Sequence, residues 1–386
     1  MTSTTAKRNI AISLPSTGDE EWQALREPLT TGWLTQGPKV AAFERAFAAR
    51  HQVEHALAVT SCTTGLHLLL AAAGIGPGDE VIVPAFTWVA TANAVVYTGA
   101  TPVFADVSTV TNNIIPDEVA RRLTPRTKAV IAVHLFGLCA DMPALRAALP
   151  SGVRLFEDCA CAAGASLDGI PAGGLGDGGV FSFHPRKSIT TGEGGMLTTD
   201  DASLAAIADQ LRNHGAEVSE EQRHAGPRPY LLPDFNLLGF NYRMTDLQGA
   251  LGLVQLEKLD RFVAERAHWA SYYRRELSGI PWLQLPFVPD GSTHAWQAFV
   301  TRLDPRTAPM PRNQVMERLQ AAGVATRPGT HAVHVLGYYR ERFGFEPDDY
   351  PGALDCHENT MAIPLHNRMT SDDYAYVVQC LHDVSV

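Results

Sequence analysis

The sequence lacks any run of apolar residues long enough to cross a membrane, since no stretch approaches about 18 uninterrupted apolar residues. Runs of Lys or Arg are also missing, and the formal net charge is −10, which argues against a nucleic-acid surface. The first fifteen residues, MTSTTAKRNIAISLP, contain no long apolar core of the kind that a signal peptide carries. We therefore expect a cytoplasmic protein with neither a membrane nor a nucleic acid as partner.

Cysteine is scarce and shows no pairing pattern. The six cysteines form no CxxC pair and no dense scaffold, which is typical of reduced thiols in the cytoplasm; they stand at positions 62, 139, 159, 161, 356 and 380. Internal repeats and low-complexity segments are missing as well. A chain of 386 residues without these features is long enough for a large core and two domains.

A nucleotide-binding loop is not present either. The pattern GxxxxGK[ST] does not occur, and "GIGPGD" at 74–79 has only part of a dinucleotide loop. A dinucleotide loop follows a strand and opens a helix, whereas this stretch follows the helical "GLHLLLAAA" and precedes the strand-like "EVIVP". It is therefore predicted to be the stop of a helix and a turn.

Short β-rich runs alternate with helical stretches from about residue 55 to residue 200. Most of these runs are continuously apolar, as expected of strands that are covered on both faces. The predicted strands are Glu80–Pro84, Pro102–Asp106, Ala129–His134, Val153–Glu157, Val180–Phe183 and Met196–Thr199. The pattern predicts an α/β fold with an open, mostly parallel sheet that is flanked by helices.

The second part of the chain has a different pattern. Apolar residues near a spacing of 3.6 predict long helical structure over Thr245–Leu277, which the prolines at 281 and 286 end. A strand-like "AWQAFVTRL", a helix-like "RNQVMERLQAAG" and a closing helix follow. We expect a large domain at 1–255, with the N-terminal segment, and a smaller α+β domain at 256–386.

The stretch "FSFHPRKSITTGEGGML" (181–197) places Lys187 between an alternating, half-buried strand and three glycines. A lysine in a loop is most often a solvated charge. The alternative is a reactive amine at a strand end, with the glycines allowing the backbone to pass close to a planar ligand.

Hydroxyl residues open another helix. "TSCTTGLHLLL" (60–70) sets Ser61, Thr63 and Thr64 at a helix N-terminus, where free backbone N–H groups and the helix dipole suit a phosphate. Simple N-capping by Ser61 or Thr63 is the other interpretation.

Two further strand ends carry candidate residues. "RLFEDCACAAGA" ends a strand with Glu157 and Asp158, where a carboxylate can reach a buried cation or act only as a surface acid or helix cap. "VPAFTWVAT" places Phe86 and Trp88 just beyond a strand, where a ring can stack on a flat cofactor, although packing in the core is commoner for tryptophan.

One chemistry uses all of these groups. Pyridoxal phosphate needs a lysine for its aldehyde, an acid that keeps its pyridine nitrogen protonated, an aromatic face, and donors for its phosphate. The lysine reacts as the neutral amine, so it belongs beside a partly apolar strand end. The combination predicts pyridoxal phosphate as the cofactor.

The sequence also resembles the DegT/StrS-type sugar aminotransferases, which have the pyridoxal-phosphate fold type I. The resemblance spans residues 32 to 260 and is weaker toward the C-terminus. The stretches that carry it are "GWLTQGPKVAAFE", "SCTTGLHLLLAAAGIGPGDEVIVPAFTWVATANAVVYTGATPVFADV", "LTPRTKAVIAVHLFG", "FEDCACAAGA", "FSFHPRKSITTGEGGMLTTD" and "GFNYRMTDLQGALGLVQLEKLD".

The resemblance implies a role for each matching residue. Lys187 would be the catalytic Schiff-base lysine, Asp158 the partner of the pyridine nitrogen, and Trp88 the stacking ring. The other implied cofactor ligands are Thr63, Thr64 and Ser182 at the phosphate, Asn241 reaching the phosphate of the other subunit of a homodimer, and Cys161 near the ring oxygen, where the family usually has glutamine or histidine. The predicted substrate-binding residues are His184, Arg243 and His331.

The C-terminal substrate loop departs from the pattern HYxPxH of many family members. Here "GTHAVH" keeps His334, has Gly329 in place of the leading histidine, and offers His331 instead. A zinc pair of the two histidines is disfavoured, because no acidic or cysteine third ligand clusters nearby in the sequence. Some perosamine-type 4-aminotransferases place their histidine at the same offset, so a contact from His331 to the sugar or diphosphate is predicted; packing in a surface loop is the alternative.

These observations predict an aminotransferase that converts a nucleotide-linked keto-sugar to an amino-sugar, at C4 of a 4-keto-6-deoxyhexose, with glutamate or glutamine as donor. A dehydratase with the same cofactor is one alternative, which the presence of Lys187 disfavours because that branch of the family replaces the lysine with histidine. A non-catalytic regulator that binds the cofactor or a sugar nucleotide is the other.

Overall fold

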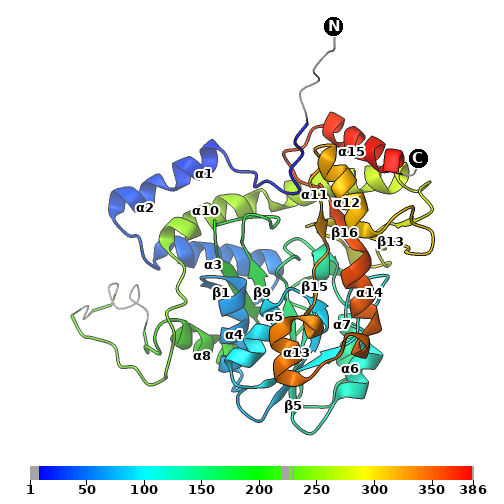
Figure 1. The fold of residues 1–386 in the computed structure, drawn as a ribbon. Helices are drawn as coiled ribbons and strands as arrows, with labels where there is room; N and C mark the ends of the chain where they lie inside the picture. Colours follow the sequence, from blue (N-terminus) through cyan, green and yellow to red (C-terminus); the bar gives the residue numbers. More distant parts are fainter. Residues whose placement is uncertain (1–7, 219–225, 228–229, 385–386) are drawn as a thin grey trace.

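The computed structural model describes residues 8–218, 226–227 and 230–384 (Figure 1). A seven-stranded sheet has the order β1-β10-β9-β6-β5-β2-β4. Only β10 runs against its neighbours, so the predicted mostly parallel sheet is confirmed. The strands are β1 (His55–Val59), β2 (Glu80–Pro84), β4 (Thr101–Ala105), β5 (Thr127–Val133), β6 (Arg154–Asp158), β9 (Gly178–Ser182) and β10 (Gly195–Thr199).

Helices cover both faces of this sheet. Val81 and Val83 belong to the core that includes residues of α4 (Cys62–Ala72), α5 (Ala90–Tyr97) and α8 (Ala202–Arg212). Ile82, which points to the opposite face, shares a core with Val119 of α6 (Pro116–Arg122) and Leu145 of α7 (Met142–Ala148). On that second face α3 (Pro38–His51) packs against β1 and α10 (Asp246–Glu257). Burial on both faces explains why the strands are continuously apolar.

A smaller antiparallel sheet lies at one end of the molecule, with α12 (Arg312–Ala321) and α15 (Ser371–Val384) (Figure 1). Its strands, in the order β11-β13-β16-β14, are β11 (Leu283–Gln284), β13 (Phe299–Leu303), β16 (Thr360–Ile363) and β14 (Arg327–Pro328). The predicted α+β character of the C-terminal part is thereby confirmed. The long helical stretch is two helices, because Lys258 separates α10 from α11 (Leu259–Glu276). Ile10 pairs with Val324 and packs into the core of this part.

The remaining elements are short and connect the two parts. A two-stranded ribbon joins β3 (Phe86–Thr87) to β15 (His331–Ala332). The others are α1 (Asp19–Ala24), α2 (Arg26–Thr31), β7 (Ser166–Leu167), β8 (Ile170–Pro171), β12 (Ser292–Thr293), α13 (Gly337–Phe343) and α14 (Pro351–Asn359). The segment at 74–79 is a turn between α4 and β2, as predicted. Among the described helices, none combines the length and apolar character that a membrane span requires.

Candidate active site

The candidate residues follow strands whose carboxyl ends meet at one edge of the large sheet. Ser61 and Thr63 come directly after β1, Trp88 shortly after β2, and Asp158 is the last residue of β6. Lys187 lies five residues after the end of β9. Because β1, β2, β6 and β9 run in the same direction, these ends form one edge, where ligands bind in open α/β sheets.

Lys187 is held in a tight turn and is half-buried. Its backbone N–H donates to the carbonyl of His184 at 2.9 Å, and its Nζ donates to Cys161 Sγ at 3.2 Å. Burial acts to lower the pKa of Lys187, but Cys161, Cys62 and Asp158 act in the opposite direction, and the net pKa is raised above its ordinary value. The lysine is therefore not a solvated surface charge, and its protonation is coupled to the thiol beside it.

Asp158 points into the site from the end of β6 and is 4% exposed. Its Oδ2 accepts a hydrogen bond of 2.7 Å from Thr91 Oγ1, and its Oδ1 accepts one of 3.1 Å from the Ala160 N–H. Cys62 Sγ lies 3.8 Å from the same Oδ1. The carboxylate is thus oriented by hydrogen bonds and retains acceptor capacity for a cationic partner.

Glu157 lies next to Asp158 in the sequence and points to the opposite face of β6. Its carboxylate accepts from three backbone N–H groups at 2.7–2.8 Å, those of Gly173, Leu175 and Gly176. His134 Nε2 lies 2.7 Å away, and because His134 Nδ1 accepts from the Ala140 N–H, Nε2 is the donor. These hydrogen bonds use the carboxylate of Glu157 for contacts within the chain. Of the two acids, only Asp158 is therefore available to a ligand.

His134, Glu157 and Cys159 also form a buried group with the spacing of metal ligands. The ligand atoms are already committed: His134 uses both ring nitrogens, and Glu157 accepts four hydrogen bonds. Burial raises the pKa of Cys159 well above its ordinary value, which opposes the thiolate that a metal requires. We interpret the group as a structural network that fixes the loop after β8.

Helix α4 begins with a capping box. Ser61 Oγ accepts from the Thr64 N–H at 3.1 Å, while Thr64 Oγ1 accepts from the Ser61 N–H at 3.0 Å. The N-capping interpretation is thus confirmed for Ser61. The Thr64 hydroxyl also donates to the Ser61 carbonyl at 2.9 Å, so a phosphate contact would require it to give up this donated bond, whereas Thr63 is not part of the box. The N–H groups of Cys62 and Thr63 lie in the first turn, where they have no partner within the helix.

Gly195 brings Ser182 and the start of α4 together. Gly195 pairs with Ser182 of β9 on one side and with Val59 of β1 on the other. A Cβ at Gly195 would lie 2.7 Å from the Ser61 carbonyl carbon and 2.8 Å from Cys62 N. Only glycine therefore allows this close approach, which explains one of the three glycines after Lys187.

Trp88 and His331 lie side by side. Trp88 is 59% exposed, so it does not pack in the core of this chain. The two ring centroids are 5.6 Å apart, because His331 pairs with Thr87 in the ribbon formed by β3 and β15. The first residue of "GTHAVH" must be glycine, since a Cβ at Gly329 would lie 2.4 Å from Thr360 Oγ1.

Two other histidines near these segments have internal partners. His334 is fully buried and its Nε2 lies 3.0 Å from the Pro347 carbonyl, so it does not face the site together with His331. His184 is half-buried, and its Nδ1 accepts from the Arg186 N–H at 3.2 Å. The turn that carries Lys187 therefore uses His184 as an internal acceptor.

Asn241 and Arg243 lie away from the Lys187 cluster of the same chain. Arg243 pairs with Val59 of β1, which is separated from Ser182 by β10. At about 4.8 Å per strand, the backbone of Arg243 lies about 14 Å from Ser182 across the sheet.

The polar atoms of this segment are incompletely satisfied. Arg243 Nη1 donates to Asn213 Oδ1 at 2.9 Å. Arg243 Nε is buried and has no hydrogen-bond partner among the described residues. Asn241 is exposed.

Sequence reasoning did not identify Thr91, Thr87 and Cys62 as residues of the site. Thr87 Oγ1 and Thr91 Oγ1 are 3.0 Å apart, and Thr91 Oγ1 in turn donates a hydrogen bond to Asp158. The sequence offered no periodic signal for this pair, since Thr87 ends β3 and Thr91 lies in the first turn of α5. Cys62 resembles an ordinary core residue in the sequence, and only its contact with Asp158 shows its place.

The carboxyl-edge site, with a half-buried lysine, an oriented buried carboxylate and an unpaired helix N-terminus, defines the class: a pyridoxal-phosphate-dependent enzyme of fold type I. The chain belongs to the DegT/DnrJ/EryC1/StrS aminotransferase family, which its residues 15–382 match. It is a sugar aminotransferase with pyridoxal phosphate as cofactor.

The relatives agree along nearly the whole chain. The spore coat polysaccharide biosynthesis protein SpsC of Bacillus subtilis is 40% identical over 382 residues, which is 98% of each chain. DesI, solved in the presence of its TDP-sugar product, is 33% identical with a TM-score of 0.87, over 97% of this chain and 92% of DesI. Spr1654 of Streptococcus pneumoniae, described as a sugar aminotransferase, was solved in forms with pyridoxal phosphate and pyridoxamine phosphate; the former is 28% identical with a TM-score of 0.90, over 98% of both chains.

Proposed function

We propose that the enzyme transfers the amino group of glutamate or glutamine to C4 of a nucleotide-linked 4-keto-6-deoxyhexose. The observation that carries this proposal is the position of His331 beside the exposed ring of Trp88, on the ribbon that follows β2. An imidazole at this place suits the sugar or its diphosphate. The TDP-sugar product of the related DesI supports a nucleotide-linked substrate.

The contacts of the site residues support the following roles. Bound pyridoxal phosphate supplies an aldehyde that receives the amino group and a conjugated ring that spreads negative charge. The Lys187 amine would hold the cofactor in the resting enzyme and, once released, would act as the base that carries the proton. Asp158, oriented by Thr91, keeps the pyridine nitrogen protonated. Trp88 would stack on the cofactor ring, and Cys161 would lie near its ring oxygen.

The phosphate would be held by the first turn of α4 and by Ser182, which Gly195 brings together. Thr63, and Thr64 after an exchange of hydrogen bonds, would add hydroxyl donors. Phosphate oxygens not reached by these groups need donors from elsewhere.

We infer that a second copy supplies these donors in a homodimer with shared sites. Asn241 is exposed, and its side-chain amide offers N–H donors that suit an anion held by the other copy. The preceding segment exposes Tyr230 at 77%, Leu232 at 85% and Leu238 at 94%, an apolar surface that a second copy would cover.

Amino-donor use is tested by mixing the yellow cofactor-loaded enzyme with glutamate or glutamine. A transaminase loses its colour with its donor alone, and borohydride reduction beforehand should fix pyridoxyl mass on the peptide that contains Lys187. Label on another lysine would remove Lys187 from its role. A yellow colour that persists with both donors would favour the alternative that the protein is a non-catalytic regulator.

The sugar is identified by mass spectrometry of products from a panel of nucleotide-linked 4-keto and 3-keto sugars. Amination at C4 supports the proposal, amination at C3 overturns its regiochemistry, and a deoxygenated product without nitrogen indicates a dehydratase. His331→Ala should raise KM for the sugar nucleotide while leaving the glutamate half-reaction unchanged.

Shared sites are tested with hybrid dimers of Lys187→Ala and Asn241→Ala chains. One of the two sites in each hybrid carries neither defect, so activity should exceed that of both parents after subunit exchange. Activity that stays at parental levels after verified exchange would show that each chain completes its own site.

A further inference from the structure

His357, which no step above uses, lies behind the substrate loop. Its ring centroid is 6.0 Å from that of His331, at an interplanar angle of 36°. The backbone N–H of Ala332, the residue after His331, donates to His357 Nδ1 at 3.4 Å. His357 thus contacts both His331 and the backbone of the residue that follows it.

The hydrogen bond from the Ala332 N–H determines the protonation state of the His357 ring. An Nδ1 atom that accepts from an N–H has no proton, so His357 is neutral and carries its proton on Nε2. Burial lowers the pKa of His357, which favours the same neutral form, although the Thr330 backbone opposes this shift. The residue is therefore a fixed acceptor for the loop.

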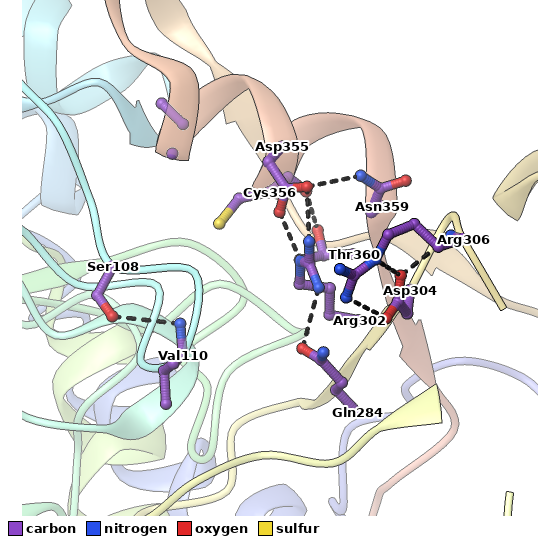
Figure 2. Close-up of polar contacts among 12 residues, drawn as sticks. Ser108, Val110, Gln284, Arg302, Asp304, Arg306, Asp355, Cys356, Asn359 and Thr360 are labelled. Carbon is purple, nitrogen blue, oxygen red and sulfur yellow. Dashed lines mark hydrogen bonds and ion pairs between the residues drawn. The ribbon is translucent and has the colours of Figure 1, made fainter. Parts of the chain in front are cut away.

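Helix α14 holds His357 rigidly, because it is anchored at its start and in its middle. Asp106, after β4, accepts from the N–H groups of Gly352 at 2.9 Å and Ala353 at 2.8 Å. In the middle of the helix, Figure 2 shows Asp355 between Arg302 of β13 and Asn359. The Arg302 Nη2–Asp355 Oδ1 distance is 2.6 Å, and the Asn359 Nδ2–Asp355 Oδ1 distance is 2.9 Å.

A second arginine fixes the backbone at His357 itself. Arg312 Nη1 donates to the His357 carbonyl at 2.6 Å and to the Thr360 carbonyl at 3.2 Å. The last turn of α14 is thus bound to α12 and to β16. Such a support keeps a side chain within the narrow geometry that substrate binding needs.

We propose that His357 is a positioning residue, which holds the loop at 330–332 so that the imidazole of His331 faces the sugar nucleotide. The ribbon with β3 fixes one side of the loop, and His357 fixes the other. This inference rests on the proposed role of His331. It assigns His357 no contact with substrate or cofactor.

The test compares His357→Leu with His357→Asn. Leucine removes the acceptor, whereas the Oδ1 of asparagine can take the place of Nδ1. We expect His357→Leu to weaken binding of a nucleoside diphosphate and to raise KM for the sugar nucleotide roughly fivefold, the effect of one hydrogen bond. The glutamate half-reaction and kcat should stay unchanged, and His357→Asn should restore most of the affinity.

Calorimetry on the cofactor-loaded enzyme with TDP, UDP and GDP measures the affinity apart from turnover. In the His331→Ala background, His357→Leu should have no further effect, because the two residues act as a unit. If His331→Ala leaves affinity and KM unchanged, the proposed function of that residue fails. If His331→Ala weakens binding but His357→Leu does not, or if asparagine fails to rescue a folded protein, the positioning role of His357 is overturned.

Discussion

Lys187 Nζ donates a hydrogen bond of 3.2 Å to Cys161 Sγ, so the amine that we propose to hold the cofactor has a thiol as its neighbour. Burial alone lowers the pKa of Lys187, and the raised net pKa depends first on Cys161. The thiol therefore opposes the neutral amine that captures the cofactor.

Replacing this thiol should make Lys187 easier to deprotonate. In Cys161→Ala the effect of burial remains and the largest opposing contribution is lost, so the pKa of Lys187 falls. The rate at which cofactor-free protein captures pyridoxal phosphate should then reach its plateau at lower pH than in the parent. Cys159→Ala is the control, since that thiol contacts Glu157; an identical shift in the control would exclude a specific effect of Cys161.

Substitutions of Asp158 and Glu157 should have different effects, the first on the reaction and the second on thermal stability. Asp158→Asn should leave the fold largely intact and slow the glutamate half-reaction roughly 10- to 100-fold, the range for losing one charge-assisted hydrogen bond. Glu157→Gln should lower thermal stability instead, because the amide cannot accept all four donors that surround the carboxylate. Stopped-flow absorbance and thermal melts measure the two effects. Unchanged half-reaction rates in Asp158→Asn would reduce this residue to a structural role.

Gly195→Ala should disturb the phosphate end of the site. The new Cβ would lie 2.7–2.8 Å from the backbone of Ser61 and Cys62, so α4 must shift. We expect a loss of about 1–3 kcal/mol in unfolding free energy together with weaker binding of pyridoxal phosphate. Gly279→Ala is the matched control, because a Cβ there meets nothing within 4 Å. Equal affinities for the cofactor in both variants would contradict this account.

His51 should make the protein less stable in mild acid. Its Nδ1 bonds to the Ala172 carbonyl, and burial lowers its pKa from 6.5 to about 4. Between pH 6.5 and about pH 4 the unfolded chain binds a proton at His51 that the folded chain does not. The contribution of neutral His51 to the unfolding free energy is therefore complete above pH 6.5 and is lost as the pH falls. From pH 7 to pH 5 the loss is about 2 kcal/mol.

Urea unfolding at pH 7 and pH 5 measures this contribution. His51→Phe should reduce the difference in unfolding free energy between the two pH values, even if it lowers stability at pH 7 by losing the bond to Ala172. The exposed His268→Phe serves as control. An unaltered difference in His51→Phe would assign the acid sensitivity to other groups.

Local order in the sequence determined the open sheet and most of its strands, because continuous apolar runs with turn residues between them fit only strands covered on both faces. The strand β1 was missed, since HALAV contains two alanines and a single β-branched residue and so has little β-propensity. The same local order placed Lys187, Asp158 and Trp88 at strand ends, and the parallel direction of those strands then brought them to one edge.

Contacts between distant segments were decided only by the tertiary structure. The strand pattern alone left Glu157 and Asp158 equivalent, and only the family resemblance favoured Asp158. In the structure the alternation of β6 directs Glu157 into a structural network and Asp158 into the candidate site. Thr91 lies 67 residues from Asp158, and Cys161 lies 26 residues from Lys187, so neither contact has a local signal. Side-chain partners of this kind depend on strand register and helix packing, which one chain segment cannot specify alone.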